Sequence, residues 1–113
     1  MKWKKYNKLV RDKIPEIILD QGKELSYRTL SEAEFKEYLE KKLDEEVAEL
    51  HDAVEHHPNK ILEELADIEE VLYALAETHR HTVFDLGRMR RRKLREKGGF
   101  INRICLIEVR EDD

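Results

Sequence analysis

The sequence is poor in the residues that cross-link or interrupt small folds. It contains one cysteine, Cys105, together with four glycines and two prolines among 113 residues. A single cysteine excludes a framework of disulfide bonds within the chain and is compatible with a reducing cytoplasm. The apolar neighbours Ile104 and Leu106 favour a packing role for Cys105 over that of a reactive thiol.

Long apolar runs and glycine-rich loops are missing as well. No stretch of the chain approaches the roughly 18 consecutive apolar residues of a membrane-spanning helix, and no apolar segment follows its basic start. We therefore expect a cytoplasmic protein with no membrane partner. The patterns Gly-x-x-x-x-Gly-Lys, Gly-x-Gly-x-x-Gly and Gly-x-Ser-x-Gly do not occur, so a phosphate loop and serine hydrolysis lack support.

Charge is what the chain has in abundance. Charged residues make up 42% of it and hydrophobic residues 40%, and the net charge is −4. This composition is typical of a helix-rich protein with strongly amphipathic elements. The length fits a single domain over residues 1–113. Narrow apolar stripes bury little area, so we expect a homodimer or homotetramer, and the negative net charge argues against a nucleic-acid partner.

Local signals mark the first two helices. Pro15 suits the first turn of a short helix, and Gly22 suits its end. Ser31 followed by Glu34 is a capping box, which satisfies backbone N–H groups at a helix start. We expect a long helix from this point to about His57, because apolar residues recur there every three or four positions.

Two further helices should follow. Pro58 breaks the long helix, and Asn59 is the expected N-cap of the next, which should run to about His79. The short connection favours antiparallel neighbours. Thr82 is the expected cap of a last helix that ends at Gly98.

The rest of the chain suggests a small amount of β structure. Residues 100–109 are β-prone, and they are a candidate strand partner for residues 26–30. The fold that we predict is all-α, an antiparallel helical bundle with a minor β appendage.

Both long helices carry carboxylates near their middle. In the first, Glu46 and Glu49 fall on one edge of the apolar stripe, with Glu45 beside Glu49. In the second, Glu64 and Asp67 flank the stripe one turn apart. Antiparallel packing would bring the two pairs together, and such like charges require protonation or a cation. Mg²⁺ prefers carboxylate oxygens, and helical bundles build metal sites from facing helices.

Spacing alone leaves alternatives open. With 26 Asp and Glu residues in the chain, similar triads also arise on solvated helix faces. Basic residues near the start of the chain and between Arg88 and Lys97 present the same choice. Both groups can bind phosphates. Alternatively, the basic residues near the start of the chain are solvated charges, and those between Arg88 and Lys97 pair with the acidic helices of the same bundle.

Three blocks of sequence, taken in order, resemble a known family. Residues 45–49, Glu-Glu-x-x-Glu, are followed after 14 residues by Glu-x-x-Asp at 64–67. This pair resembles the signature of the MazG-like all-α nucleoside triphosphate pyrophosphohydrolases. Residues 6–15 and 93–100 are similar to one small branch of that superfamily, which is predicted to remove noncanonical nucleotides.

The resemblance implies a reaction and a metal. The reaction is hydrolysis of a nucleoside triphosphate between the α and β phosphorus atoms, which yields a nucleoside monophosphate and pyrophosphate. Mg²⁺ is the implied cofactor, with Mn²⁺ as an alternative. The residues that match the family's metal ligands are Glu46, Glu49, Glu64 and Asp67. Glu45 would bind a second metal or orient the attacking water, so the implied catalytic acids are Glu45, Glu46 and Glu49.

The basic groups then have a role in binding the substrate. We expect the phosphates to be neutralised by Lys8, Arg11 and Lys13, with Lys93 or Lys97. A neighbouring alternative is a phosphoribosyl-ATP pyrophosphohydrolase of the same superfamily. The alternative from another class is a helical module that binds a protein or a nucleic acid.

Overall fold

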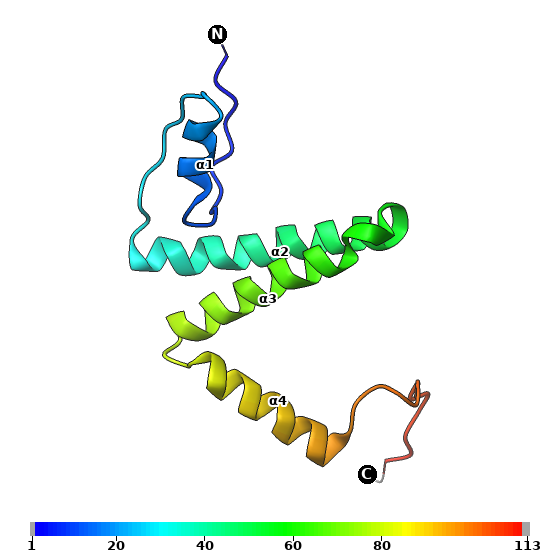
Figure 1. Ribbon diagram of the computed structural model, residues 1–113. Helices are drawn as coiled ribbons and strands as arrows, with labels where there is room; N and C mark the ends of the chain where they lie inside the picture. Colours follow the sequence, from blue (N-terminus) through cyan, green and yellow to red (C-terminus); the bar gives the residue numbers. More distant parts are fainter. Residues whose placement is uncertain (1, 112–113) are drawn as a thin grey trace.

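The computed structural model describes residues 2–111, and its architecture over that range is all-α (Figure 1). The described part of the chain forms four α-helices and one 3₁₀ turn: α1 (Ile14–Asp20), α2 (Glu32–His56), the turn Pro58–Lys60, α3 (Ile61–Thr78) and α4 (Val83–Lys97). The predicted all-α fold is thereby confirmed.

The short helix α1 begins and ends where local chemistry directs it. Pro15 occupies its first turn, where a missing N–H group costs nothing. Gly22 follows the helix with a φ of +75°, a left-handed conformation that glycine adopts without strain. The chain therefore turns sharply and returns towards the start of α2 (Figure 1).

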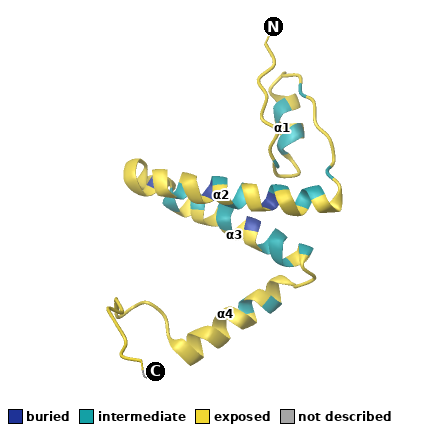
Figure 2. Ribbon diagram, turned by 180° about the vertical axis from the view of Figure 1, so that it is seen from behind, coloured by how far each residue is buried: buried dark blue, intermediate teal, exposed yellow. Residues whose placement is uncertain are grey.

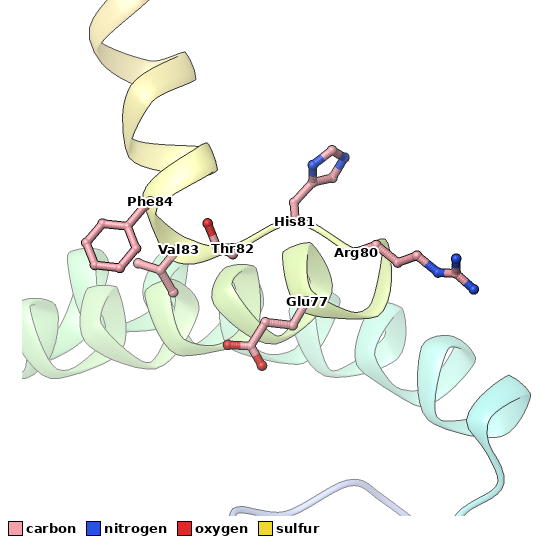
Figure 3. Close-up of a pocket in the computed structure, with 6 residues that line it drawn as sticks. All are labelled: Glu77, Arg80, His81, Thr82, Val83 and Phe84. Carbon is pink, nitrogen blue, oxygen red and sulfur yellow. The ribbon is translucent and has the colours of Figure 1, made fainter.

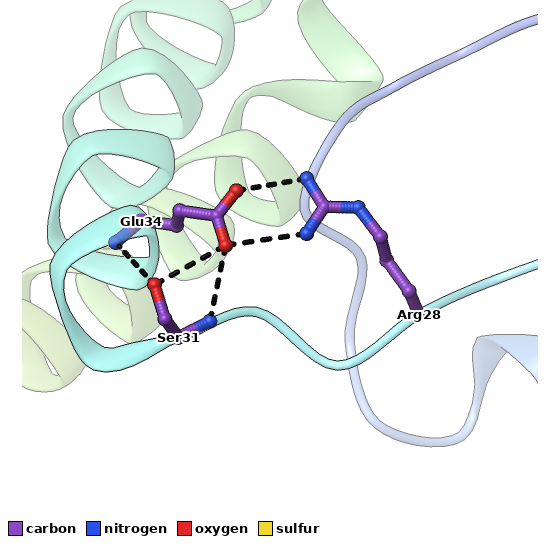
Figure 4. Close-up of polar contacts among 3 residues, drawn as sticks. All are labelled: Arg28, Ser31 and Glu34. Carbon is purple, nitrogen blue, oxygen red and sulfur yellow. Dashed lines mark hydrogen bonds and ion pairs between the residues drawn. The ribbon is translucent and has the colours of Figure 1, made fainter.

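A capping box fixes the start of α2 (Figure 4). The Glu34 backbone N–H donates to the Ser31 hydroxyl at 3.2 Å, and the Ser31 backbone N–H donates to the Glu34 carboxylate at 3.3 Å. The Arg28 guanidinium donates two further bonds to this carboxylate, at 3.2 and 2.9 Å. The bonds from Arg28, then those from Ser31, lower the pKa of Glu34 to about 2. The connector before α2 is thus tied to the helix that it precedes.

Helices α2 and α3 form an antiparallel hairpin (Figures 1 and 2). The prediction that Asn59 is the N-cap of α3 is wrong, because Asn59 lies inside the 3₁₀ turn and Lys60 precedes α3. Lys60 has φ and ψ of −101° and −3° and makes no capping hydrogen bond. An N-cap residue needs an extended backbone, and here the 3₁₀ turn after Pro58 continues directly into α3.

The hairpin contains the whole buried core of the described residues. Leu39 and Ala53 on α2 and Val71 on α3 are its buried apolar side chains, and Glu46 is buried with them. Figure 2 shows buried residues on α2 and α3 alone. A carboxylate therefore takes one of four places in a very small interior.

Helix α4 leaves the hairpin. Thr82 is its N-cap, as predicted, and forms a capping box with Asp85; Gly98, with a φ of +79°, follows its end. Among the helices α4 contacts only α3, and it diverges from α2 along its length (Figure 1). Its apolar side chains are all partly exposed, and the largest of them, Phe84, is 80% exposed.

The predicted β appendage is absent, because residues 2–111 contain no strand. Residues 26–30 and 100–109 lie at opposite ends of the molecule in both ribbon views. A strand needs a partner for its backbone N–H and C=O groups, and neither segment has one among the described residues. The apolar side chains of 100–109 point into solvent, and Ile101 is 91% exposed.

The molecule exposes more surface than its mass predicts. Its solvent-accessible surface is 10866 Å², whereas a folded monomer of 13.6 kDa exposes roughly 6,600 Å². Its radius of gyration is 19.1 Å, compared with about 13 Å for a compact chain of this length. None of the described helices is long and apolar enough to cross a membrane.

Candidate metal centre

Three predicted metal ligands meet between α2 and α3. Glu46 and Glu49 come from α2 and Glu64 comes from α3, and each offers one oxygen atom to a group whose members lie within 4.8 Å of one another. The antiparallel hairpin produces this cluster, because it places the middle of α2 beside the first turns of α3. Their role as ligands remains a prediction that this geometry favours.

The cluster contains carboxylate oxygens without hydrogen-bond donors. Glu46 is 5% exposed. In the described part of the chain, Oε2 of Glu46 and Oε2 of Glu64 are both buried and accept no hydrogen bond. Burial, together with repulsion from Glu49 and Asp67, raises the pKa of Glu46. Buried acceptors without donors are costly, and a divalent cation would satisfy them. The residues therefore fit a hard metal ion.

The fourth predicted ligand, Asp67, lies outside this triad. Its Oδ1 accepts a hydrogen bond from Nη2 of Arg11 at 2.7 Å. Both side chains are partly exposed, so the pair is accessible to solvent. The structure thus joins a predicted phosphate-binding cation to a predicted metal ligand.

Glu45 shows the same arrangement. Nζ of Lys8 donates to its Oε1 at 2.9 Å. Burial opposes ionisation of Glu45, but the hydrogen bond from Lys8 and the charge of Lys42 outweigh it and lower the pKa of Glu45. The same hydrogen bond raises the pKa of Lys8. Glu45 is therefore held as a carboxylate.

Lys42 is a member of the site that the sequence analysis missed. Its Nζ lies 3.2 Å from Oε1 of Glu46 and 3.6 Å from Oε1 of Glu45, and its side chain is only 16% exposed. The signal was present in the spacing, since residues three and four apart share one face of a helix. Lys42 supplies positive charge beside a cluster that otherwise consists of acids.

The other predicted cations differ in their distance from the acids. Lys13 lines a cleft beside the acids. Lys93 and Lys97 are exposed on α4, which contacts α3 and not α2, and no ion pair joins them to the cluster within residues 2–111. Within one chain, the structure does not bring Lys93 or Lys97 to the acids.

The cleft has a volume of about 530 Å³ and opens beside Glu46 and Asp67. Residues 9–13 form one wall, and one face each of α2 and α3 form the others. A second depression, of about 490 Å³, lies at the turn between α3 and α4 (Figure 3). It is lined by Glu77, Arg80, His81, Thr82, Val83 and Phe84. The depression lies at the end of α3 opposite to Glu64, so the cleft is the better candidate for chemistry.

Comparison with known proteins identifies the group to which the chain belongs. The model of the phosphoribosyl-ATP pyrophosphohydrolase family matches residues 6–92, which is well over half of the sequence. The chain belongs to this family. The family lies in the MazG-like all-α superfamily, so the predicted superfamily is confirmed over residues 6–92, and residues 93–100 lie outside the match. Its members are pyrophosphohydrolases, which hydrolyse acid anhydrides, and they are generally metal-dependent.

One relative is similar to the chain over a shorter stretch. An uncharacterised protein from Mycolicibacterium smegmatis is 56% identical over 45 residues, which cover 40% of this chain and 46% of the relative. The match thus spans about half the length of that relative. No solved structure matches the chain.

Proposed function

We propose that this protein is a Mg²⁺-dependent nucleoside triphosphate pyrophosphohydrolase that removes noncanonical nucleotides in the cytoplasm. It would cleave the bond between the α and β phosphorus atoms and release a nucleoside monophosphate and pyrophosphate. The observation that carries the proposal is the triad of Glu46, Glu49 and Glu64, with two buried oxygens that lack donors. It occurs in a chain of a pyrophosphohydrolase family.

The acidic residues divide into two roles in this proposal. Glu46, Glu49 and Glu64 would hold the metal together with Asp67. When bound, Mg²⁺ supplies the charge that neutralises phosphate oxygens and makes water a stronger acid. Glu45 stays ionised and partly exposed beside Lys8, so it can accept a hydrogen bond from the attacking water and orient it.

The cations would serve the substrate. Arg11 pairs with Asp67 at 2.7 Å. If Asp67 held the metal, the guanidinium of Arg11 would be free to bind a phosphate through two hydrogen bonds. Lys42 and Lys13 stand beside the same cleft. Positioning and charge neutralisation of this kind account for most catalysis of phosphoryl transfer.

Phosphoribosyl-ATP is the second candidate substrate. The description of the matching family favours it directly. Both candidates contain the α–β anhydride that the proposed site would cleave, so the same acids serve either. An activity assay can distinguish the two substrates, whereas the geometry of the acids cannot.

We also propose that the working protein is a homodimer or homotetramer. The chain exposes roughly 4,000 Å² more than a folded monomer of its mass, which exceeds the roughly 800 Å² that each partner buries in a standard interface. A second copy of the chain is the simplest cover for α4 and residues 100–109.

The test is release of pyrophosphate from canonical and modified nucleoside triphosphates and from phosphoribosyl-ATP. We expect release with Mg²⁺ and none with a chelator. Glu49→Gln should lower the rate by about a hundredfold or more, because it removes one charged ligand. Glu40→Gln is the matched control, since Glu40 is exposed on the same helix and makes no ion pair within the described residues.

Two outcomes would contradict the proposal. A folded protein that releases no pyrophosphate from any compound would favour the alternative of a helical interaction module. Release that persists with chelator and in Glu49→Gln would reject the metal centre.

A further inference from the structure

The cleft extends well beyond the acids. It continues along α2 from Glu46 towards Phe35 and along α3 from Asp67 towards Glu77. The helices are antiparallel, so both directions lead to the same end of the hairpin (Figure 1). Ten or eleven residues along a helix correspond to about 15 Å. The cleft is therefore longer than is needed for the phosphates that the metal centre would bind.

The lining of the cleft changes along its length. Lys42 and Arg11 stand near the acids, while Leu39, Ala74 and Phe35 make the middle and the far end apolar. An apolar slot with a few fixed polar groups is the usual form of a small-molecule site, and its volume of about 530 Å³ falls in the usual range of about 300–1,000 Å³. Such a slot suits a flat ring system attached to a charged tail.

Two exposed carboxylates border this apolar part of the cleft. Glu70 and Glu77 line the cleft, and neither makes an ion pair or hydrogen bond to another side chain within residues 2–111. Figure 3 shows the Glu77 carboxylate directed away from Arg80 and His81. Both side chains accept hydrogen bonds and, when ionised, donate none.

We propose that the cleft holds the sugar and base of the nucleotide, and that Glu70 and Glu77 select a base that carries an exocyclic amino group. This inference rests on the proposed function. An amino group on cytosine, adenine or guanine can donate to a carboxylate, as in the recognition of cytosine by Glu or Asp. Uracil and thymine present carbonyl oxygens at the corresponding positions, and a carboxylate repels these. A site built to pair with a donor rejects analogues that lack it.

The first experiment separates the base from the phosphates. The probes are a cytidine triphosphate analogue with an α,β-imido bridge and inorganic tripolyphosphate, each titrated with Mg²⁺ by calorimetry. Ala74→Trp fills the slot, so affinity for the nucleotide analogue should fall at least about tenfold, while affinity for tripolyphosphate stays unchanged. Ala66→Trp, at an exposed position of the same helix, should change neither affinity.

Opposite results reject the assignment. Unchanged binding of the analogue by a folded Ala74→Trp protein would show that the base lies elsewhere. A fall in oligomeric mass in Ala74→Trp would show that a second copy of the chain occupies the cleft.

The second experiment tests recognition of the base and does not introduce a bulky side chain. The ratio of affinities for the cytidine and uridine analogues should favour cytidine in the unmodified protein. It should fall by roughly tenfold when Glu70 and Glu77 both become Gln, since one tenfold step corresponds to a typical charged hydrogen bond. Glu63→Gln is the control, because Glu63 lies on α3 outside the cleft.

Failure of this inference and failure of the proposed function give different results. An unmodified protein that releases no pyrophosphate rejects both. Pyrophosphate release combined with a base preference that Glu70→Gln and Glu77→Gln leave unchanged rejects the cleft assignment alone.

Discussion

Glu46 is under opposing demands. Burial and the neighbouring acids disfavour its charge, and Lys42 provides its ion pair at 3.2 Å. A carboxyl group whose pKa is higher in the folded state than in the unfolded state lowers stability at pH values where the unfolded chain has lost the proton, because loss of the same proton is less favourable in the folded chain. The protein without metal therefore loses stability as the pH rises above the ordinary glutamate value of 4.5 and through the raised pKa.

Replacing this charge should stabilise the protein when metal is absent. We expect Glu46→Gln to raise the free energy of unfolding at pH 7 by about 1 kcal/mol and to flatten its dependence on pH. The same change should abolish metal binding. Urea unfolding in chelator, at fixed protein concentration and with Glu40→Gln as control, measures the first effect. A lower stability of Glu46→Gln at pH 7 would show that the pair with Lys42 outweighs burial and repulsion.

Glu34 has the opposite shift. Its pKa of about 2 lies below the ordinary 4.5 because Arg28 and Ser31 hold the ionised form. The stability that this gives is fully present above about pH 4.5 and is lost as the pH falls towards 2. In Arg28→Gln the pKa of Glu34 should move upwards, as followed by NMR titration of its side chain. A pKa that stays near 2 in this variant would assign the shift to the capping box alone.

The helices differ in what holds them in place. α2 and α3 cover one another, whereas α4 rests on α3 alone and begins at the capping box of Thr82 and Asp85. Loss of an N-cap hydroxyl costs about 1 kcal/mol, and a helix with few tertiary contacts feels this locally.

Thr82→Ala should therefore loosen α4 without loosening the hairpin. The expected result is faster amide hydrogen exchange in Val83–Lys97, with protection unchanged in Glu32–His56. Ser31→Ala serves as the comparison, because loss of that cap should lower protection of α2. Equal losses in both helices after Thr82→Ala would mean that α4 and the hairpin open together.

Local chemistry explains why much of the fold was predictable. The caps Ser31 and Thr82 and the terminating residue Gly98 act over one helical turn, so each is visible in a short window of sequence. The prediction of Asn59 as an N-cap was wrong because Pro58 starts a 3₁₀ turn that includes Asn59. The prediction of a strand at residues 100–109 was wrong for a different reason, since a strand depends on a partner distant in sequence.

The same distinction between local and distant contacts separates the parts of the candidate site that could be predicted from those that could not. Helical spacing together with antiparallel packing was enough to bring Glu46, Glu49 and Glu64 together. The pair of Arg11 with Asp67 joins residues 56 positions apart, and no periodicity encodes it. Lys42 precedes Glu45 and Glu46 by three and four residues, so helical spacing is enough to place it beside them.

The whole molecule is more open than a folded monomer of its mass. Large apolar side chains on α4 and in residues 100–109 face solvent, among them Phe84, Phe100 and Ile104. Exposed apolar surface of this extent marks an interface between proteins. The three buried apolar residues of the hairpin are a small core for 113 residues.

Sedimentation equilibrium should therefore give a mass of at least twice 13.6 kDa. Phe84→Glu places a charge on the uncovered face of α4 and should shift the mass towards that of one chain. Lys60→Glu changes an exposed position in the turn before α3 and serves as the control. A monomer at micromolar concentration, with its helices intact, would contradict the proposed assembly.

Exposed ion pairs hold the start of the chain against the hairpin. α1 contacts no other helix, and the cleft wall formed by residues 9–13 is held to the hairpin by the ion pairs Lys8–Glu45 and Arg11–Asp67. Dissolved ions screen such exposed pairs, since the Debye length falls from about 8 Å at physiological ionic strength to about 3 Å at 1 M. Apolar contact holds α2 against α3 and is not screened in this way. Concentrated salt should thus detach one wall of the cleft while the two helices that carry the acids stay together.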